Sequence, residues 1–401
     1  LLGRIYSPNN KKSRVQNPGR QVTTQGGDNG RDKEVCTLTV GLPVTQRARS
    51  QHPDEPLKSE LWGERPRRIH FHSHFTAELF CDFPGPSGAA SVMAEEKELS
   101  YKEAIEKASS SITRFPLIPI RGIPLMCHIA NNWDSIWAFR PDPSDLLIAT
   151  YPKAGTTWTQ EIIDLLLHNG DAEACKRAPT PVRSPFLEIC SPPPIPSGLD
   201  LLKKMSPPRL IKTHLPFQLV PLGFWENKCK AIYVARNAKD NLVSYYYFHL
   251  MNKTQPEPGP FDSYIQDFMR GELSWGSWYD HVKGYWVERE EKNILYLFYE
   301  DMKENPRREV ERIMRYLDLS VSDDVINRIV ELTSFQSMKE NPMANYSCIP
   351  SPVFDQSISP FMRKGEVGDW KNHFTPEQSK MFDEDYEKQM KDVNIPFRSL
   401  I

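Results

Sequence analysis

Two lysines, a histidine and an arginine stand at the ends of short apolar runs in this sequence, and together they could bind an anion. Lys153 follows one run, Lys212 and His214 close a second, and Arg236 follows a third. Packing alone predicts no such preference for basic side chains at the ends of buried strands. A histidine can also accept a proton near neutral pH. The pattern predicts a site for a ligand with more than one negatively charged group.

The stretch Thr150–Trp158, TYPKAGTTW, has the composition of a phosphate-binding turn between a strand and a helix. Gly155 lets the backbone approach an anion, and Thr156 and Thr157 add hydroxyl and N–H donors at a helix N-terminus. Lys153 precedes the only glycine, whereas in the common loop GxxxxGK[ST] the lysine follows the second glycine. Taken alone, the stretch is equally compatible with an ordinary turn.

Whether two further pairs of residues can contact the same ligand depends on the fold. Lys212 and His214 point to the same side of a strand and can converge on one reacting atom, although an edge strand with two solvated side chains is the plainer alternative. Ser244 follows Arg236 by eight residues on a predicted helix. One anion contacts both only if that helix folds back over the strand end.

Four apolar runs predict buried strands, and they span Asp145–Ala149, Pro208–Pro216, Lys230–Ala235 and Asn293–Tyr299. Segments with helical periodicity alternate with them, and Asn169-Gly170 and Asn305-Pro306 mark a helix end and a helix start. This alternation predicts an α/β fold: a single domain with a central parallel sheet flanked by helices, in a P-loop-like nucleotide-binding architecture. Such sheets bind ligands beyond the carboxyl ends of their strands.

Other segments carry expectations about packing. Trp133, Trp137 and Phe139 are predicted to pack in the core rather than contact a ligand, because large aromatic rings are first of all apolar bodies. The proline-rich segment 176–208, which contains Pro185–Glu188, is predicted to be a surface loop of the kind that can cover a pocket.

Composition excludes several classes of protein. The chain of 401 residues has a formal charge of −2 and no basic stripe, so a nucleic-acid partner is not expected. Its seven cysteines follow no metal-binding or disulfide spacing, which favours a reducing compartment. No run of about 18 apolar residues is present, so we expect no membrane-spanning helix and a cytoplasmic protein.

The first 92 residues differ in composition from the rest. They are rich in Gly, Pro, Ser, Asn and Arg and show no sustained periodicity. We expect a disordered extension over residues 1–92 and a folded domain over residues 93–401, with Met93 as the natural start.

Five motifs occur in an order that resembles the cytosolic sulfotransferases, and in particular the phenol or aryl type. They are TYPKAGTTW, RLIKTHLP, YVARNAKD, LFYEDMK and FMRKGxxGDWKN. The resemblance covers roughly residues 110–401. It implies transfer of a sulfuryl group from 3′-phosphoadenosine 5′-phosphosulfate (PAPS) to a hydroxyl or amine of a small, phenolic acceptor, without a metal.

The resemblance also implies a role for individual residues. His214 would be the general base, Lys153 and Lys212 would stabilise charge on the leaving and attacking oxygens, and Ser244 would restrain Lys153 before the acceptor arrives. The PAPS-binding residues would be Lys153, Ala154, Gly155, Thr156, Thr157, Trp158, Arg236, Ser244, Tyr299, Thr333, Ser334, Phe335, Met338, Phe361, Met362, Arg363, Lys364 and Gly365. The acceptor-binding residues would be Phe186, Lys212, His214, Tyr246 and Phe248.

Two alternatives share the need to bind anions. A metal-dependent small-molecule kinase would need the GxxxxGK[ST] loop and an acidic pair for Mg²⁺, and neither is evident in the sequence. A non-catalytic nucleotide-binding module would have no use for a base such as His214.

The last third of the chain carries two more expectations from the resemblance. Residues 339–360 would form a movable cover over the site. The homodimer motif of the family, KxxxTVxxxE, is altered here over Lys371–Lys380, with Pro376 in place of valine and Lys380 in place of glutamate. A homodimer is therefore in doubt.

Overall fold

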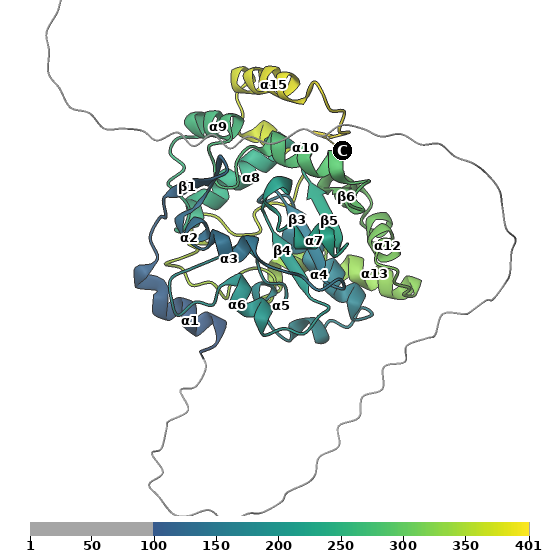
Figure 1. Cartoon of the computed structure of the whole chain (residues 1–401). Coiled ribbons are helices and arrows are strands. Elements are labelled where there is room, and N and C mark those ends of the chain that lie inside the picture. The colour runs from purple at the N-terminus through teal and green to yellow at the C-terminus, as the bar shows by residue number, and fades with distance from the viewer. Residues whose placement is uncertain (1–98, 401) are drawn as a thin grey trace, which may run out of the picture. The chain divides into compact units, whose positions relative to one another are not determined.

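The computed structural model describes residues 99–400, and the predicted disordered extension over residues 1–92 lies outside the described residues (Figure 1). The strands are β1 (Leu117–Ile120), β2 (Ile123–Met126), β3 (Leu146–Thr150), β4 (Leu210–Thr213), β5 (Lys230–Ala235) and β6 (Ile294–Phe298). The α-helices are α1 (Tyr101–Ala108), α2 (Cys127–Asn131), α3 (Trp133–Trp137), α4 (Thr156–Leu167), α5 (Thr180–Arg183), α6 (Gly198–Lys203), α7 (Gly223–Glu226), α8 (Ala238–Met251), α9 (Phe261–Arg270), α10 (Trp278–Glu288), α11 (Tyr299–Glu304), α12 (Pro306–Tyr316), α13 (Asp323–Leu332), α14 (Phe335–Glu340) and α15 (Pro376–Met390).

The central sheet contains β3 to β6, all parallel, in the order β4-β3-β5-β6. Leu146 of β3 lies beside Leu210 of β4 on one side and Lys230 of β5 on the other. The chain therefore leaves β3 toward one edge and later crosses to the other side. Such a reversal opens a crevice at the carboxyl ends of the strands, where α/β proteins bind their ligands.

Both faces of the central sheet are buried. Alternate side chains along each strand point into two different hydrophobic clusters, one on each face. In β3, Leu147 and Ala149 belong to one cluster, and Leu146 and Ile148 belong to the other. The first cluster contains buried residues of α8, α9 and α10, and the second those of α4, α12 and α13. A sheet buried on both faces requires strands that are apolar throughout, which is why they appear in the sequence as short continuous runs. The predicted α/β fold is confirmed.

The first strand–turn–helix unit begins and ends as the sequence predicts. Gly155 is the N-cap residue of α4 with φ 110°, a backbone conformation that favours glycine. After α4, Asn169 and Gly170 have φ values of 52° and 76°, and the N–H of Gly170 donates to the carbonyl of Leu165 at 2.7 Å. Asn305 likewise caps α12 with its side chain, ahead of Pro306 in the first turn.

The prediction that Pro185–Glu188 lies in a surface loop is wrong. Leu187 and Glu188 are fully buried, and the segment extends the sheet beside β4 through a parallel bridge between Phe186 and Lys212. The surrounding prolines suggested a loop, but this short segment hydrogen-bonds to β4 along one edge, through the N–H of Leu187 and the carbonyl of Pro185. Trp133, Trp137 and Phe139 pack in or against the core, as predicted.

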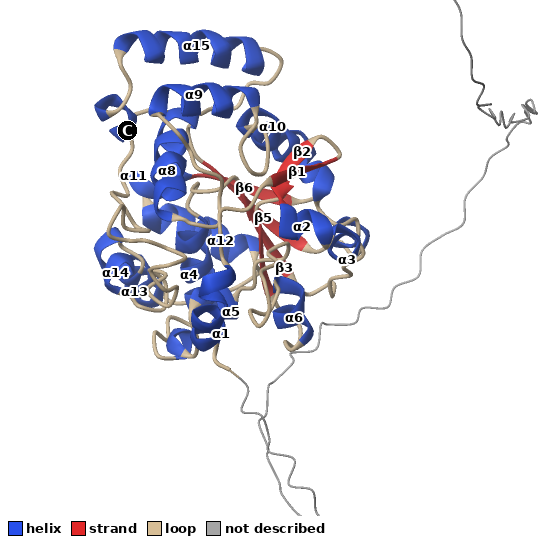
Figure 2. Ribbon diagram, turned by 90° about the vertical axis from the view of Figure 1, so that its left-hand side faces the viewer, coloured by secondary structure: helices blue, strands red, loops and turns tan. Residues whose placement is uncertain are grey.

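At the end of the described chain, α15 packs alongside α9 (Figure 2). Thr375 and Gln378 form a capping box at its start, and Pro376 occupies the first turn. Lys380 points to solvent with 80% of its side chain exposed, and its ammonium lies 3.9 Å from the carboxylate of Glu384. Over residues 99–400, the structure contains no helix that combines the length and the apolar composition needed to cross a membrane.

Candidate active site

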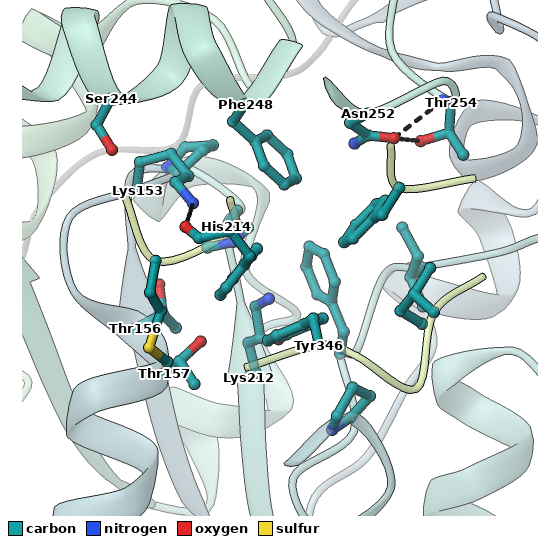
Figure 3. A pocket seen from close by; sticks show the side chains of 18 of the residues that line it. Lys153, Thr156, Thr157, Lys212, His214, Ser244, Phe248, Asn252, Thr254 and Tyr346 are labelled. Carbon is teal, nitrogen blue, oxygen red and sulfur yellow. Dashed lines mark hydrogen bonds between the residues drawn. The ribbon is translucent and has the colours of Figure 1, made fainter. Parts of the chain in front are cut away.

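A cavity of about 290 Å³ lies at the carboxyl ends of β3, β4 and β5 (Figure 3). Its two ends differ in chemistry. One end is lined by Lys153, Arg236, Arg363 and Lys364, and the other by apolar side chains that come from outside the central sheet. These apolar wall residues include Tyr101, Ile105, Ile112, Ile189, Ile195, Ile349, Val353 and Phe354. The cavity therefore joins an anion-binding end to an apolar end.

Most of the predicted site residues line this cavity. They are Lys153, Gly155, Thr156, Thr157, Trp158, Phe186, Lys212, His214, Arg236, Ser244, Phe248, Tyr299, Thr333, Phe335, Met338, Phe361, Met362, Arg363, Lys364 and Gly365. Three predicted residues do not line it. Ala154 is fully buried within the turn, Ser334 is exposed and caps α14, and Tyr246 packs against Phe261 and Tyr264.

The turn after β3 holds Lys153 with a positive φ of 70°. Its ammonium donates to the carbonyl of Phe361 at 3.2 Å and lies 4.0 Å from the centre of the Phe361 ring and 4.6 Å from that of Phe248. A Cβ on Gly155 would come within 3.0 Å of the Tyr299 ring. Only glycine therefore suits this position, for steric and conformational reasons.

The two lysines lie in an environment that disfavours their charged forms. Burial, followed by the charges of Lys212, Arg236 and Arg363, lowers the pKa of Lys153 to about 7. Burial also lowers the pKa of Lys212 to about 8, although the carboxylate of Glu188 acts in the opposite direction. An anion placed among these groups would raise both pKa values, so the site favours a negatively charged ligand.

His214 has a fixed orientation. Its Nδ1 lies 2.8 Å from the backbone carbonyl of Thr150, and since a carbonyl only accepts, Nδ1 carries the proton. Burial and then the charge of Lys212 hold the pKa of His214 well below its ordinary value. Nε2 of the neutral ring is therefore the proton acceptor of His214, whose side chain lines the cavity (Figure 3).

The cationic end of the cavity fits a phosphorylated nucleotide. Nε of Arg236 and Nε of Arg363 are buried without a hydrogen-bond partner, and a buried donor of this kind calls for a polar ligand. The guanidinium of Arg236 lies 4.4 Å above the centre of the Tyr299 ring. A Cβ on Gly365 would overlap the ring of Phe335, at 2.2 Å, so Phe335 lies directly against this backbone. Aromatic rings and paired cations suit an adenine base and phosphate groups respectively.

Helix α8 brings Ser244 and Arg236 to the same cavity. The helix starts directly after Arg236 and Asn237, and both Arg236 and Ser244 line the cavity, so the helix does return over the strand end. Ser244 and Phe248 are four residues apart and share one helix face. Tyr246 is two residues from each and lies on the opposite face. The prediction that Tyr246 lines the acceptor pocket is therefore wrong.

The family model for the sulfotransferase domain matches residues 143–394, which is more than half of the chain. The chain belongs to the sulfotransferase family. It is 52% identical to rat sulfotransferase 1 family member D1 over 290 residues, covering 72% of this chain and 98% of that protein. It is 51% identical to human sulfotransferase 1C2 over 278 residues, covering 69% of this chain and 94% of that protein.

Solved structures of sulfotransferases share this fold. The structure of retinol dehydratase in complex with androsterone and the inactive cofactor PAP aligns with a TM-score of 0.65 and 26% identity, over 71% of this chain and 93% of that chain. Mouse sulfotransferase SULT7A1 complexed with PAP aligns with a TM-score of 0.58 and 30% identity, over 69% and 95% of the two chains. This sulfotransferase is thus an enzyme that transfers the sulfuryl group of PAPS to small acceptors.

The residues of the sulfotransferase site that were not predicted from the sequence include three with polar groups in or beside the cavity. Glu188 lies behind the wall formed by Phe186 and His214, Trp275 lines the cavity, and Asn252 lines it at the apolar end. Asn252 is the C-cap residue of α8 and follows Ser244 and Phe248 at intervals of four residues, a spacing that could have revealed it. No comparable sequence signal marks Glu188 or Trp275.

Proposed function

We propose that this sulfotransferase transfers the sulfuryl group of PAPS to the hydroxyl of a small phenol, with His214 as the general base. The orientation of His214 is the observation that supports this proposal most strongly. Its Nδ1–H donates to the carbonyl of Thr150, so that Nε2 can take the acceptor's proton. The same geometry would serve an aromatic amine.

The acceptor would bind between aromatic rings. Phe186 and Phe248 line the cavity beside His214, and the Phe186 ring packs edge-on against the imidazole with centroids 4.9 Å apart. Tyr346 and Phe361, whose ring centroids are 4.1 Å apart, line the same cavity. Planar apolar walls around a single base favour a phenol ring over a flexible aliphatic alcohol.

The donor would bind at the cationic end. When bound, PAPS supplies the sulfuryl group and a phosphate leaving group. Thr156, Thr157 and the N-terminus of α4 would bind its 5′ end. The 3′-phosphate would contact Arg236, Ser244, Arg363, Lys364 and Gly365, and the adenosine would lie among Trp158, Tyr299, Thr333, Phe335 and Met338. Lys153 and Lys212 would stabilise the negative charge that develops between donor and acceptor.

Substitution of the proposed base tests this function. We expect His214→Ala to lower kcat for transfer of labelled sulfate to 4-nitrophenol by about 10²- to 10⁴-fold, the usual contribution of a positioned general base. The Kd for PAP, measured by calorimetry, should stay within about twofold, because the base does not bind the nucleotide.

His168→Ala is a matched control, because His168 lies at the end of α4 and does not line the cavity. It should retain wild-type turnover. Near-normal turnover by His214→Ala would show that His214 is not the base, and a wild-type enzyme without activity on any phenol would contradict the acceptor class. The cytoplasmic location and the domain boundary at residue 93 stay predictions from the sequence.

A further inference from the structure

A buried carboxylate lies directly behind the cavity wall that carries His214. Glu188 is fully buried and does not line the cavity. Its Oε1 accepts hydrogen bonds from the backbone N–H of His214 at 2.7 Å and from the indole N–H of Trp275 at 3.1 Å. Its Oε2 accepts from the hydroxyl of Thr213 at 2.9 Å. Burial raises the pKa of Glu188 to about 7, and the hydrogen bonds from the His214 N–H and the Thr213 hydroxyl, together with the charge of Lys212, act in the opposite direction. At pH 8 the carboxylate is therefore mostly ionised, and an ionised carboxylate can accept from all three donors.

Backbone hydrogen bonds fix this carboxylate in place. The N–H of Leu187 donates to the carbonyl of Lys212 at 2.8 Å, and the N–H of Lys212 donates to the carbonyl of Pro185 at 2.9 Å. The segment is thereby attached to β4, the strand that also carries Lys212 and leads into His214. Any displacement of Glu188 would move the strand end that presents these two side chains.

Trp275 connects the carboxylate to the walls of the cavity. Its ring stacks on Phe186 with a centroid distance of 5.9 Å and an interplanar angle of 22°, and meets the His214 ring edge-on at 5.4 Å. Its backbone has a positive φ of 67°, which is rare for a bulky residue and persists only where the surroundings hold it. The hydrogen bond to Glu188 is one such restraint, and the backbone N–H of Trp275 donates a second to Pro124 at 2.9 Å.

The balance of charge around the cavity gives this carboxylate a second role. Lys153, Lys212, Arg236 and Lys303 line the cavity, and no Asp or Glu of residues 99–400 does so. Arg363 and Lys364 also line it, but both are paired with the carboxylate of Asp369. A proton on His214 would add a further positive charge to this group. A carboxylate bonded to the backbone of His214 opposes that repulsion in a medium of low dielectric constant.

We propose that Glu188 is a positioning residue and a buried counter-charge for His214 and Lys212. The proposal rests on the proposed function of His214 as the base. Glu188 holds the strand end and the Trp275 ring in place, and its negative charge stabilises the imidazolium that forms when Nε2 takes the acceptor's proton. It also favours the charged form of Lys212, on which burial acts in the opposite direction.

The isosteric variant Glu188→Gln tests both roles in the full-length enzyme. Without the carboxylate, the pKa values of His214 and Lys212 both fall, so both limbs of the bell-shaped pH profile of kcat should move to lower pH by about one unit. The other groups that face this pair, Lys153 and His281, are unchanged in the variant. On the alkaline limb of the profile we expect kcat to fall by up to about tenfold, since there the charged fraction of Lys212 drops tenfold for each unit that its pKa falls. The Kd for PAP should change less than about threefold.

Three further variants separate charge from structure. Glu188→Asp keeps the charge and should leave the pH profile in place while kcat falls. Trp275→Phe and Thr213→Val each remove one donor to Glu188 and should lower kcat with an unchanged Kd for PAP. Glu309→Gln is the matched control, because Glu309 is a buried carboxylate on α12 that bonds to Arg308 and Arg312 and does not line the cavity.

The outcomes are distinct. A pH profile of Glu188→Gln that coincides with the wild type, or shifts no more than that of Glu188→Asp, overturns the proposal. If Glu188→Gln fails to fold, unchanged kcat values in Trp275→Phe and Thr213→Val overturn it instead. Titration of the His214 imidazole by NMR in the PAP complex needs no turnover, and we expect a lower pKa in Glu188→Gln. A wild-type enzyme that sulfates no phenol would refute the proposed function. The NMR comparison would then still test whether the charge of Glu188 raises the pKa of His214.

Discussion

At the scale of single residues, the pKa values of the two lysines in the site lie close to neutral pH. The pKa of Lys153 is lowered to about 7 and that of Lys212 to about 8, in each case by burial first. At pH 8 neither ammonium is fully protonated in the free enzyme. A nucleotide with several negative charges reverses this by raising both pKa values.

Binding of PAP should therefore take up protons. Calorimetry at pH 8 in buffers of different ionisation enthalpy should show uptake of a proton on binding, and the Kd should weaken by about tenfold per pH unit for each proton taken up. Lys153→Gln should reduce the uptake, whereas Lys102→Gln on the exposed face of α1 should not. Binding with no proton uptake at pH 8 would show that the lysines are already charged in the free enzyme.

The cationic residues of the site could be predicted from sequence, and their partners could not. Lys153, Lys212, His214 and Arg236 end strands of a parallel sheet, and those ends must meet at one edge. Glu188 contacts His214 only because its segment pairs with β4 in the folded protein. No local sequence pattern predicts this pairing. Trp275 likewise reaches the cavity through tertiary structure alone. Tyr246 was predicted to line the acceptor pocket, but its side chain lies on the opposite face of α8 from Ser244 and Phe248.

At the scale of elements, the turn between β3 and α4 depends on one glycine. Gly155 combines a φ of 110° with a Tyr299 ring that lies 3.0 Å from the position of an added Cβ. The turn presents Lys153, Thr156 and Thr157 to the cavity, so a strained backbone here would displace the groups proposed to hold the donor.

Gly155→Ala should weaken PAP binding by about tenfold or more and lower the free energy of unfolding by about 1–2 kcal/mol, the usual strain of a left-handed backbone with a side chain. Gly122→Ala provides the control, because Gly122 has a φ of 83° with nothing within 4 Å of an added Cβ, in the turn between β1 and β2. It should lose similar stability without any change in the Kd for PAP. Equal losses of affinity in both variants would mean that the turn has no special role.

The four central strands were predictable because burial on both faces makes them continuous apolar runs. The hairpin of β1 and β2 was not, because Pro119 lies opposite Pro124 in its register. Prolines lack the N–H that a strand pair needs, so this proline-punctuated stretch carries no strand signal. Local composition thus predicted the interior of the sheet better than the pieces at its margin.

At the scale of the whole molecule, the altered dimer motif affects the surface and leaves the fold intact. The start of α15 is well capped by Thr375 and Gln378, with Pro376 in its first turn. Lys380 carries a positive charge to solvent at the position where the family motif has a glutamate. A reversed charge at a self-complementary interface disfavours pairing of two copies.

We expect sedimentation velocity to show a monomer for the wild type at micromolar concentration. The double variant Pro376→Val and Lys380→Glu should shift the distribution toward a dimer. Lys388→Glu makes the same charge change at another exposed position of α15 and should remain monomeric. A stable wild-type dimer in this experiment would mean that the altered motif still supports association.

The apolar end of the cavity is built from α1 and from segments outside the central sheet, whereas Lys153, His214 and Arg236 follow its strands. Substitutions at Ile105, Ile195 or Val353 would reshape one end and leave the other untouched. Natural variation or laboratory selection can therefore redirect such an enzyme to new acceptors through its peripheral segments, while the machinery of group transfer is inherited unchanged.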